Sequence, residues 1–240
     1  MSVMDSPAWF GAQRFWVFDL DDTLFPEKLF VMGGFRAVAE RVVREHGVDI
    51  STVLARNFER GLRHDAFRVA VEGFGIAVDE PYAKELVTTY REHRPKLVPF
   101  DDAPPLIEAL SSQAGCPIGI VTDGLADVQR RKLAALPLCE AARSVVVTDE
   151  LGGRSAWKPN PVGLTTCLQQ LLCTDPSLAV YVADNPEKDF LAAHRAGMHA
   201  IRIARPGTEH GAAEVDDIAK APDLTFSSLT GLLTALGLGG

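Results

Sequence analysis

The sequence lacks the features that would place a protein in a membrane or outside the cell. No apolar stretch approaches the ~20 residues needed to span a bilayer, and Met1–Phe10 has neither the basic start nor the apolar segment of a signal peptide. The cysteines Cys116, Cys139, Cys167 and Cys173 fit no CxxC spacing. They indicate reduced, mostly buried thiols rather than disulfides or a zinc site, and we expect a cytoplasmic protein with no membrane partner.

Basic residues are also in the minority. Lys and Arg number 24 against 32 Asp and Glu, which gives a net charge of −8. This balance argues against a nucleic-acid-binding surface, which usually carries a basic stripe. The chain has 240 residues, of which 47% are hydrophobic, and this is enough to bury a sizeable core in one large domain or slightly more.

Short apolar runs alternate with amphipathic stretches along most of the chain. The runs predict strands at Phe15–Asp19, Pro117–Thr122, Ser144–Thr148, Ala179–Ala183 and His199–Ile203, with a weaker one near Asp223–Phe226. The amphipathic stretches predict helices at about Ala103–Gln113, Leu125–Ala135, Pro161–Leu172 and Pro186–Arg195. Such alternation is typical of an α/β fold with a parallel sheet covered on both faces.

The segment between Pro26 and Pro99 breaks this alternation. It contains no convincing strand, and it shows helical spacing at Val31–His46, Ile50–Arg63, Asp65–Phe74 and Pro81–His93. We therefore predict an α/β core made of residues 1–25 and 99–240, and an all-helical domain of residues 26–98 inserted after the first strand.

Two carboxylates, Asp19 and Asp21, follow the first apolar run. Strand alternation would turn both side chains to the same face. Neighbouring carboxylates repel each other unless a cation or a shared proton relieves them. The pattern suits a divalent metal, with one carboxylate as nucleophile and the other as proton carrier. An ordinary acidic turn after a strand is the plainer interpretation of this motif alone.

Three later segments place polar side chains at the ends of other predicted strands. Thr122 precedes Asp123-Gly124, where a hydroxyl and free backbone N–H groups can hold an anionic oxygen. Lys158 precedes Pro159 at the start of a helix, where a fixed ammonium can neutralise a phosphate or a carboxylate cluster.

The last of these segments carries Asp184, which ends a strand, and Asp189, in the first turn of the next helix. Asp189 alone could simply complement the helix dipole, whereas a carboxylate ending a buried strand is costly without a partner. Taken alone, each feature could be an ordinary turn or a surface lysine. Together, the four segments place acids, a hydroxyl and a lysine at one edge of the sheet. That set fits a divalent cation and a phosphate.

With these motifs, the chain resembles the haloacid dehalogenase (HAD) superfamily of hydrolases, specifically its phosphatases. The resemblance rests on a DxDxT motif at Asp19–Thr23, a threonine motif at Thr122, a lysine motif at Lys158-Pro159 and a DxxxxD motif from Asp184 to Asp189. It implies a Rossmann-like three-layer core with a parallel sheet, an inserted α-helical cap domain, Mg²⁺ as cofactor and a small-molecule phosphate ester as substrate, either a nucleotide or a sugar phosphate.

The resemblance also implies a role for each matching residue. Asp19 would attack phosphorus and become an aspartyl-phosphate, and Asp21 would protonate the leaving oxygen and then activate water. Thr122 would bind the phosphoryl group, and Lys158 would offset negative charge. The metal set would be Asp19, Asp21 through its backbone carbonyl, Asp184, and Asp189 in support.

Two details refine this resemblance. The stretch Asp184–Phe190 resembles the nucleotidase-like and acylneuraminate phosphatase branch. Asp123 stands where the family often has Asn, and a negative charge there would oppose phosphate binding unless its side chain points away.

The predicted cap carries a basic cluster that could recognise a second anionic group on a substrate or could be a solvated helix face. Its members are Arg56, Arg60, Arg63, His64 and Arg68. Three alternatives to a phosphatase stay open: another phosphoryl transferase, a dehalogenase of the same superfamily, and a non-catalytic binding module. The acids after Asp19 count against a dehalogenase, which needs neither a second acid nor a metal. The presence of Asp19 and Asp21 counts against the non-catalytic module.

Overall fold

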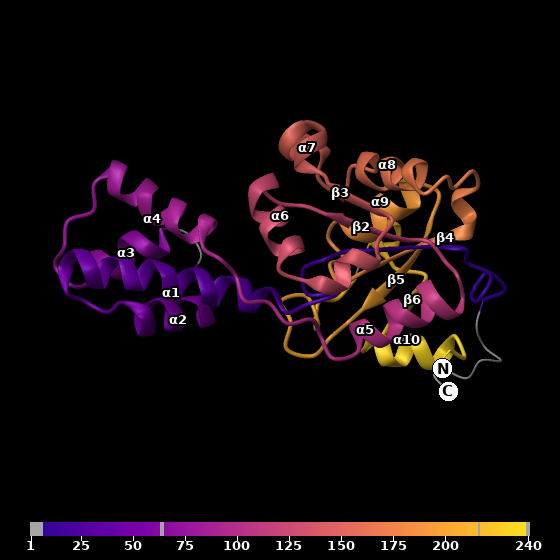
Figure 1. Cartoon of the computed structure of the whole chain (residues 1–240), viewed down its shortest axis with the longest axis horizontal. Helices are drawn as coiled ribbons and strands as arrows, with labels where there is room; N and C mark the ends of the chain where they lie inside the picture. The colour runs from indigo at the N-terminus through magenta and orange to yellow at the C-terminus, as the bar shows by residue number, and fades with distance from the viewer. Residues whose placement is uncertain (1–6, 63–64, 216, 239–240) are drawn as a thin grey trace. The chain divides into compact units, whose positions relative to one another are not determined.

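The computed structural model describes residues 7–62, 65–215 and 217–238, and its contacts divide the chain into two compact units (Figure 1). One unit combines Met1–Pro26 with Val98–Gly240, and the other is the continuous segment Glu27–Leu97. The chain therefore leaves the first unit soon after its first strand and returns to it for the rest of the fold.

A six-stranded sheet with the order β3-β2-β1-β4-β5-β6 forms the centre of the first unit, and every neighbouring pair is parallel. The strands are β1 (Phe15–Phe18), β2 (Ile118–Thr122), β3 (Ser144–Val147), β4 (Ala179–Ala183), β5 (His199–Ile203) and β6 (Leu224–Phe226). The predicted α/β fold with a parallel sheet is confirmed. The strand order reverses between β1 and β4, which is where open α/β sheets bind their ligands.

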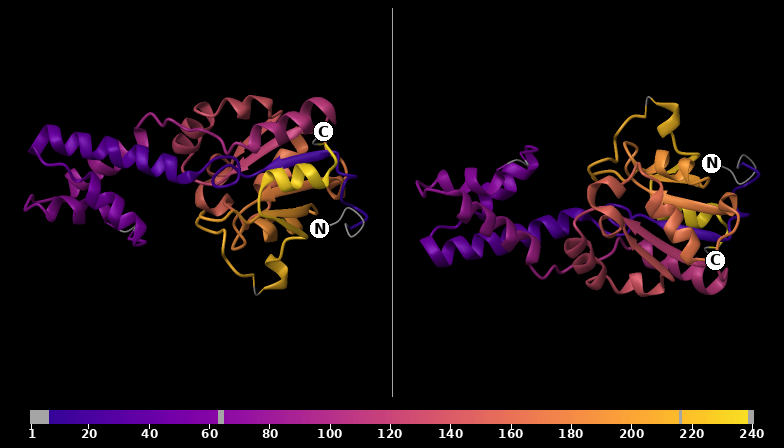
Figure 2. Two further views of the ribbon diagram at one scale, coloured as in Figure 1. Left: turned by 90° about the horizontal axis from the view of Figure 1, so that it is seen from below. Right: turned by 90° about the horizontal axis from the view of Figure 1, so that it is seen from above.

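Helices cover both faces of this sheet (Figure 2). Helices α8 (Val162–Gln170) and α9 (Asp189–Arg195) pack on one face, against β2 and β3 and against β4 and β5 respectively. Helices α5 (Ala103–Glu108) and α10 (Leu229–Ala235) contact each other on the opposite face. The unit also contains α6 (Ala126–Ala134), the short α7 (Asp149–Gly152) and the π-helical turn η2 (Ala109–Gln113). Short 3₁₀ helices lie at Pro137–Ala141, Gly153–Ala156, Pro176–Leu178 and Ile218–Lys220.

The core follows the two-residue alternation of the strands. Trp16 and Phe18 point to one face of β1 and their rings stack, with centroids 6.4 Å apart. Val17 joins a buried cluster on the other face that includes Tyr181 of β4 and Phe190 of α9. Since both faces of the sheet are buried, the strands read as continuous apolar runs, which explains why sequence alone located them.

The second unit consists of helices α1 (Glu27–His46), α2 (Ser51–Glu59), α3 (Ala66–Glu72) and α4 (Glu80–Glu92), and the described part of this unit contains no strand. Apolar side chains of all four helices form its own buried core. Helix α4 begins where the Asp79 carboxylate accepts a hydrogen bond from Tyr82 N at 2.9 Å. Helix α1 passes close to α4 at Gly34, because any Cβ there would lie 2.3 Å from the Tyr90 ring.

The structure differs from the sequence prediction at several helix ends. Helix α9 begins at Asp189 rather than Pro186, because the Asn185 side chain accepts a hydrogen bond from Glu187 N and holds a turn first. The predicted helix Ala103–Gln113 changes to π-helical geometry after Glu108. Helix α10 was not predicted; Ser228 caps it through a hydrogen bond from Gly231 N.

No helix in the described part of the chain is both long and apolar enough to cross a membrane.

Close packing at Gly119 leads to a prediction about the core of the first unit. A Cβ at Gly119 in β2 would lie 2.4 Å from the Cys167 sulfur on α8. Gly119→Ala should therefore lower the free energy of unfolding by about 1–3 kcal/mol through overpacking. In a Cys167→Ala background the same substitution should cost clearly less. Urea unfolding of the wild type, both single variants and the double variant measures this coupling, and additivity within ~0.5 kcal/mol would contradict it.

Candidate active site

Polar side chains from three adjacent strands meet at the carboxyl edge of the sheet. Asp19 follows β1 directly, Thr122 is the last residue of β2, and Asp184 follows β4. Asp19 N donates to Val182 O at 2.9 Å, so the parallel pairing continues up to the acidic residue. This edge lies at the point where the strand order reverses.

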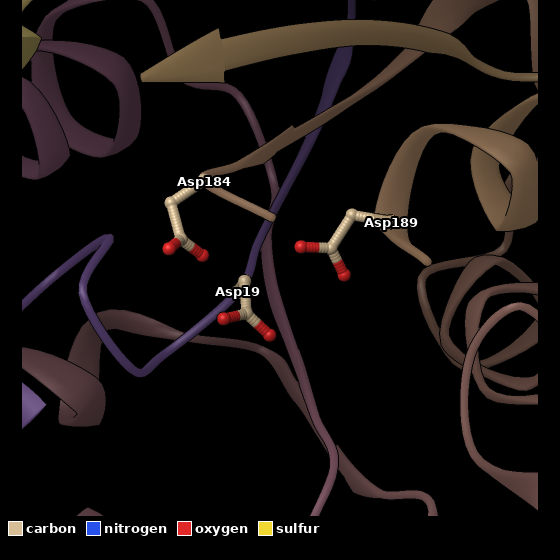
Figure 3. A group of neighbouring side chains, drawn as sticks. All are labelled: Asp19, Asp184 and Asp189. Carbon is tan, nitrogen blue, oxygen red and sulfur yellow. The ribbon is translucent and has the colours of Figure 1, made fainter. Parts of the chain in front are cut away.

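Three buried carboxylates form a cluster at this edge. Oxygen atoms of Asp19, Asp184 and Asp189 all lie within 4.8 Å of one another, and Figure 3 shows the three side chains converging from separate segments. Asp189 is fixed at the start of α9, where its Oδ2 accepts a hydrogen bond from Asn185 N at 3.1 Å. The cluster offers only oxygen ligands, which hard divalent cations such as Mg²⁺ prefer.

Lys158 lies directly against this cluster. The Lys158 Nζ is 2.5 Å from Asp19 Oδ1 and 2.8 Å from Asp189 Oδ1, and it donates to the Tyr181 hydroxyl at 2.7 Å. The Lys158 side chain is completely buried. Burial alone would lower the pKa of Lys158, but Asp189 and Asp19 hold it well above its usual value. Lys158 is thus a fixed positive charge.

Neighbouring lysines do not offset the burial of these acids. Burial, together with Asp189 and Asp19, raises the pKa of Asp184 to about 9. Burial raises the pKa of Asp19 to about 6, although Lys158 acts in the opposite direction. The cluster therefore carries an unfavourable concentration of negative charge, and a bound cation would relieve it.

Asp21 has different neighbours from Asp19. Its Oδ1 lies 2.7 Å from Lys132 Nζ, and its Oδ2 accepts a hydrogen bond from Gln129 Nε2 at 2.9 Å. Gln129 Nε2 also lies 2.5 Å from Thr122 Oγ1. The sequence predicted that Asp19 and Asp21 lie on one strand face, but β1 ends at Phe18, before both residues.

Asp123 is held by three donors. Its Oδ1 accepts from Thr148 Oγ1 at 2.8 Å and from Lys158 N at 3.2 Å, and its Oδ2 accepts from Lys188 Nζ at 2.9 Å. Burial would raise the pKa of Asp123, but Lys158 and Lys188 together lower it below its usual value. The extra negative charge is therefore matched locally.

The predicted basic cluster is only partly described. Arg60 is exposed at the end of α2, whereas Arg63 and His64 lie outside the described residues. Arg68 donates to Glu80 at 3.2 Å within the same unit. These observations assign no ligand to the cluster.

Sequence reasoning missed four residues that contact the predicted site. Gln129 and Lys132 reach Asp21, Tyr181 contacts Lys158 and Asp19, and Lys188 pairs with Asp123. Lys188 lies inside the acidic motif, and this position was a usable signal. From the sequence alone, Tyr181 looks like an ordinary strand residue, and Gln129 and Lys132 look like residues of a polar helix face.

Comparisons with known proteins agree with this geometry. The sequence model of the family described as haloacid dehalogenase-like hydrolase matches residues 16–203. A glyceraldehyde 3-phosphate phosphatase of Methanopyrus kandleri is 32% identical over 79% of this chain and 83% of that protein. A phosphoserine phosphatase of Thermus thermophilus is 28% identical over 73% of this chain and 66% of its own length.

Solved structures show the same fold. A HAD phosphatase from Thermococcus onnurineus is 26% identical, covers 94% of this chain and 98% of its own, and has a TM-score of 0.60. A HAD hydrolase of Bacillus subtilis, solved with magnesium, is 17% identical, covers 93% of this chain and 98% of its own, and has a TM-score of 0.64.

The narrower expectation of a nucleotidase-like or acylneuraminate phosphatase branch stays a prediction. The matched segment runs from β1 to the end of β5 and so contains all four motifs. The chain belongs to the haloacid dehalogenase-like hydrolases, and it is an enzyme of the phosphatase type in that family.

Proposed function

We propose that the protein is a Mg²⁺-dependent phosphomonoesterase that hydrolyses a small phosphorylated metabolite through an aspartyl-phosphate intermediate. The observation that carries this proposal is the buried cluster of Asp19, Asp184 and Asp189 with Lys158 against it. A carboxylate beside a cation site and a fixed ammonium suits phosphoryl transfer, because positioning and charge neutralisation dominate its catalysis.

The residues fit a magnesium ion. Asp19, Asp184 and the backbone carbonyl of Asp21 would hold it, with Asp189 in support, and the donors are all oxygens. The raised pKa of Asp184 shows how strongly the cluster disfavours its own negative charge. When bound, Mg²⁺ would offset the charge of the phosphoryl group during transfer.

The proposed reaction has two steps. In the first, Asp21 enters protonated, an Asp19 carboxylate oxygen attacks phosphorus, the bond to the leaving oxygen breaks, and the Asp21 proton passes to that oxygen. In the second, Asp21 takes a proton from water, the water oxygen attacks phosphorus, and the bond to Asp19 breaks. The products are the alcohol and inorganic phosphate, and Asp19 and Asp21 return to their starting states.

Two other residues would hold the transferred group. The Thr122 hydroxyl would donate to a phosphoryl oxygen, and Lys158 would neutralise charge shared between that group and Asp19. Asp123 would not oppose phosphate binding, because its carboxylate is already paired with Lys188 and hydrogen-bonded to Thr148 and Lys158 N.

We further propose that the helical unit Glu27–Leu97 is a cap that selects the substrate, as its insertion directly after the Asp19–Thr23 motif suggests. The substrate would be a small phosphate ester such as a nucleotide or a sugar phosphate. The named relatives add glyceraldehyde 3-phosphate and phosphoserine as test compounds. The four cysteines are free thiols, which is consistent with a location in the reducing cytoplasm.

A phosphate-release screen with Mg²⁺ tests the substrate class. Its panel comprises nucleotides, sugar phosphates, glyceraldehyde 3-phosphate, phosphoserine and p-nitrophenyl phosphate, with a chlorinated carboxylic acid as the dehalogenase control. Release of phosphate without release of chloride is the expected result. Chloride release without phosphatase activity would instead assign dehalogenation.

The first prediction concerns the nucleophile. Asp19→Asn should lower kcat roughly a thousandfold or more, because a carboxamide is a poor nucleophile. Phosphate release by a preparation with a native circular dichroism spectrum measures the loss. The exposed Asp127→Asn variant removes a carboxylate from α6 and should behave like the wild type. Substantial activity in a folded, sequence-verified Asp19→Asn protein would reject this nucleophile.

The second prediction links the cation to stability. At a Mg²⁺ concentration one hundred times its Kd, the folded state should gain about 2.7 kcal/mol, so EDTA should lower Tm and abolish activity. Asp184→Asn should remove this Mg²⁺ response and should be at least as stable as the wild type in EDTA, because an amide is neutral in the buried cluster without having to take up a proton. The exposed Glu140→Gln variant should keep the wild-type response.

The Asp184 carboxyl also predicts how the stability of the protein in EDTA depends on pH. Since the pKa of folded Asp184 is raised to about 9, the neutral carboxyl favours the folded state at low pH, and this contribution is lost as pH rises from about 4 to about 9. The stability of the cation-free protein should therefore decline over this range, and less so in Asp184→Asn. An equal Tm with Mg²⁺ and with EDTA across the range would contradict a cation site here.

The third prediction concerns Asp123. Asp123→Asn removes the carboxylate that lies 2.9 Å from Lys188 Nζ and weakens the hydrogen bonds from Thr148 and Lys158 N, so the free energy of unfolding should fall by about 1–3 kcal/mol. The exposed pair Arg130–Glu150, broken by Glu150→Gln, should cost less than about 1 kcal/mol. Urea unfolding of the two variants compares them, and an equal or smaller loss in Asp123→Asn would show that the Asp123 contacts contribute little.

A further inference from the structure

We propose that Gln129 and Lys132 are positioning residues that hold the Asp21 carboxylate at a fixed place relative to the Thr122 hydroxyl. Both residues lie on α6, three positions apart, so their side chains leave the same face of the helix. The inference rests on the proposed function, in which Asp21 exchanges protons with the leaving oxygen and with water.

Gln129 connects the two functional groups directly. Its Nε2 donates to Asp21 Oδ2 at 2.9 Å and lies 2.5 Å from Thr122 Oγ1. One amide nitrogen therefore fixes the separation between the proton carrier and the hydroxyl proposed to bind phosphate. The Gln129 side chain is 1% exposed, which keeps water from replacing either contact.

The turn before α6 is built to admit this amide. Gly124 has φ +130°, and a Cβ at that position would lie 3.1 Å from the Gln129 side chain. A larger residue would strain the backbone and press on the amide. Ala126 N donates to Asp149 Oδ2 at 3.1 Å, which connects the first turn of α6 to the first residue of α7.

Lys132 holds the other oxygen of the same carboxylate. Its Nζ is 2.7 Å from Asp21 Oδ1, and the lysine side chain is 3% exposed, whereas that of Asp21 is 20% exposed. A partly exposed carboxylate would otherwise sample several rotamers. With an amide on one oxygen and an ammonium on the other, its rotation is restricted.

Stability alone is a weak explanation for this arrangement. A buried lysine–carboxylate pair is often no more stabilising than apolar residues of similar volume. A precise place for Asp21 matters more for catalysis, because proton transfer depends strongly on distance and alignment. The structure therefore assigns the pair of contacts to catalysis rather than to folding.

The consequence is a dependence on the leaving group. A poor alkoxide leaving group needs the proton from Asp21, whereas p-nitrophenolate leaves readily without it. The steps up to departure of the leaving group determine kcat/KM, so loss of Asp21 alignment should lower kcat/KM for an alkyl phosphate far more than for p-nitrophenyl phosphate.

The experiment compares these two kinds of substrate in the full-length, Mg²⁺-loaded enzyme. The alkyl substrate is the most active one in the panel above. The variants are Gln129→Leu, Lys132→Met and Lys132→Arg, with Asp21→Asn as reference and the exposed neighbour Arg131→Met as matched control. The ratio of the two kcat/KM values on one preparation does not depend on the folded fraction, so partial unfolding cannot mimic the effect.

Asp21→Asn should lower kcat/KM for the alkyl phosphate by roughly a hundredfold to ten-thousandfold. Gln129→Leu and Lys132→Met should each lower it by roughly tenfold to a hundredfold. For p-nitrophenyl phosphate the loss in Lys132→Met should stay below about threefold, which is less than 1 kcal/mol. In Gln129→Leu, which also loses the contact with Thr122, the loss for p-nitrophenyl phosphate should be clearly smaller than the loss for the alkyl phosphate. Lys132→Arg should recover most of the lost selectivity, and Arg131→Met should match the wild type.

Two different failures can be told apart. If Asp21→Asn lowers the two kcat/KM values equally, the proton-transfer role in the proposed function is wrong. If Asp21→Asn shows the leaving-group dependence but Gln129→Leu and Lys132→Met do not, the proposed function stands and the positioning inference is overturned.

Discussion

Repulsion among the buried carboxylates of Asp19, Asp184 and Asp189 is the constraint on which the rest of the site depends. Their oxygens lie within 4.8 Å of one another, and Lys158 supplies one positive charge among them. Burial and the neighbouring carboxylates raise the pKa values of Asp19 and Asp184, although Lys158 acts in the opposite direction. The folded chain therefore holds more negative charge at this place than its own cations balance. A hard cation and a substrate phosphate would together complete this charge arrangement, which links cofactor, substrate and stability in one place.

The sheet makes this concentration of charge possible. Because β1 lies between β2 and β4, the ends of three adjacent strands bring Asp19, Thr122 and Asp184 to one edge. Both faces of the sheet are covered by helices, so the strands beneath the acids are buried. Two further carboxylates near this edge have partners outside the cluster. Asp123 pairs with Lys188, and Asp21 pairs with Lys132 of α6.

Much of this arrangement could be predicted from the sequence. Strands buried on both faces are continuous apolar runs, so β1 to β5 were located to within a residue or two, and the residues directly after them were natural site candidates. The structure brings Asp19, Lys158, Asp184 and Asp189 together as expected. Their catalytic roles stay predictions that the proposed experiments test.

Other parts could not be predicted because they depend on tertiary contacts. In Ala126–Ala134, Gln129 and Lys132 look like residues of a solvated helix face, and only the folded structure shows that they are buried against Asp21. The position of Asp21 outside the acidic cluster also depends on the residue at which β1 ends. If the strand ended one or two residues later, the side chains of Asp19 and Asp21 would have different neighbours.

Trapping the covalent intermediate tests the central claim most directly. The Asp21→Asn variant should still accept a phosphoryl group from p-nitrophenyl phosphate but should release it slowly, because no base activates water. Acid quenching during the first turnover, followed by peptide mass spectrometry, should find the phosphoryl group on Asp19 in a linkage that hydroxylamine cleaves. Stoichiometric release of p-nitrophenol with Asp19 unmodified, or with the phosphoryl group on another residue, would contradict the account.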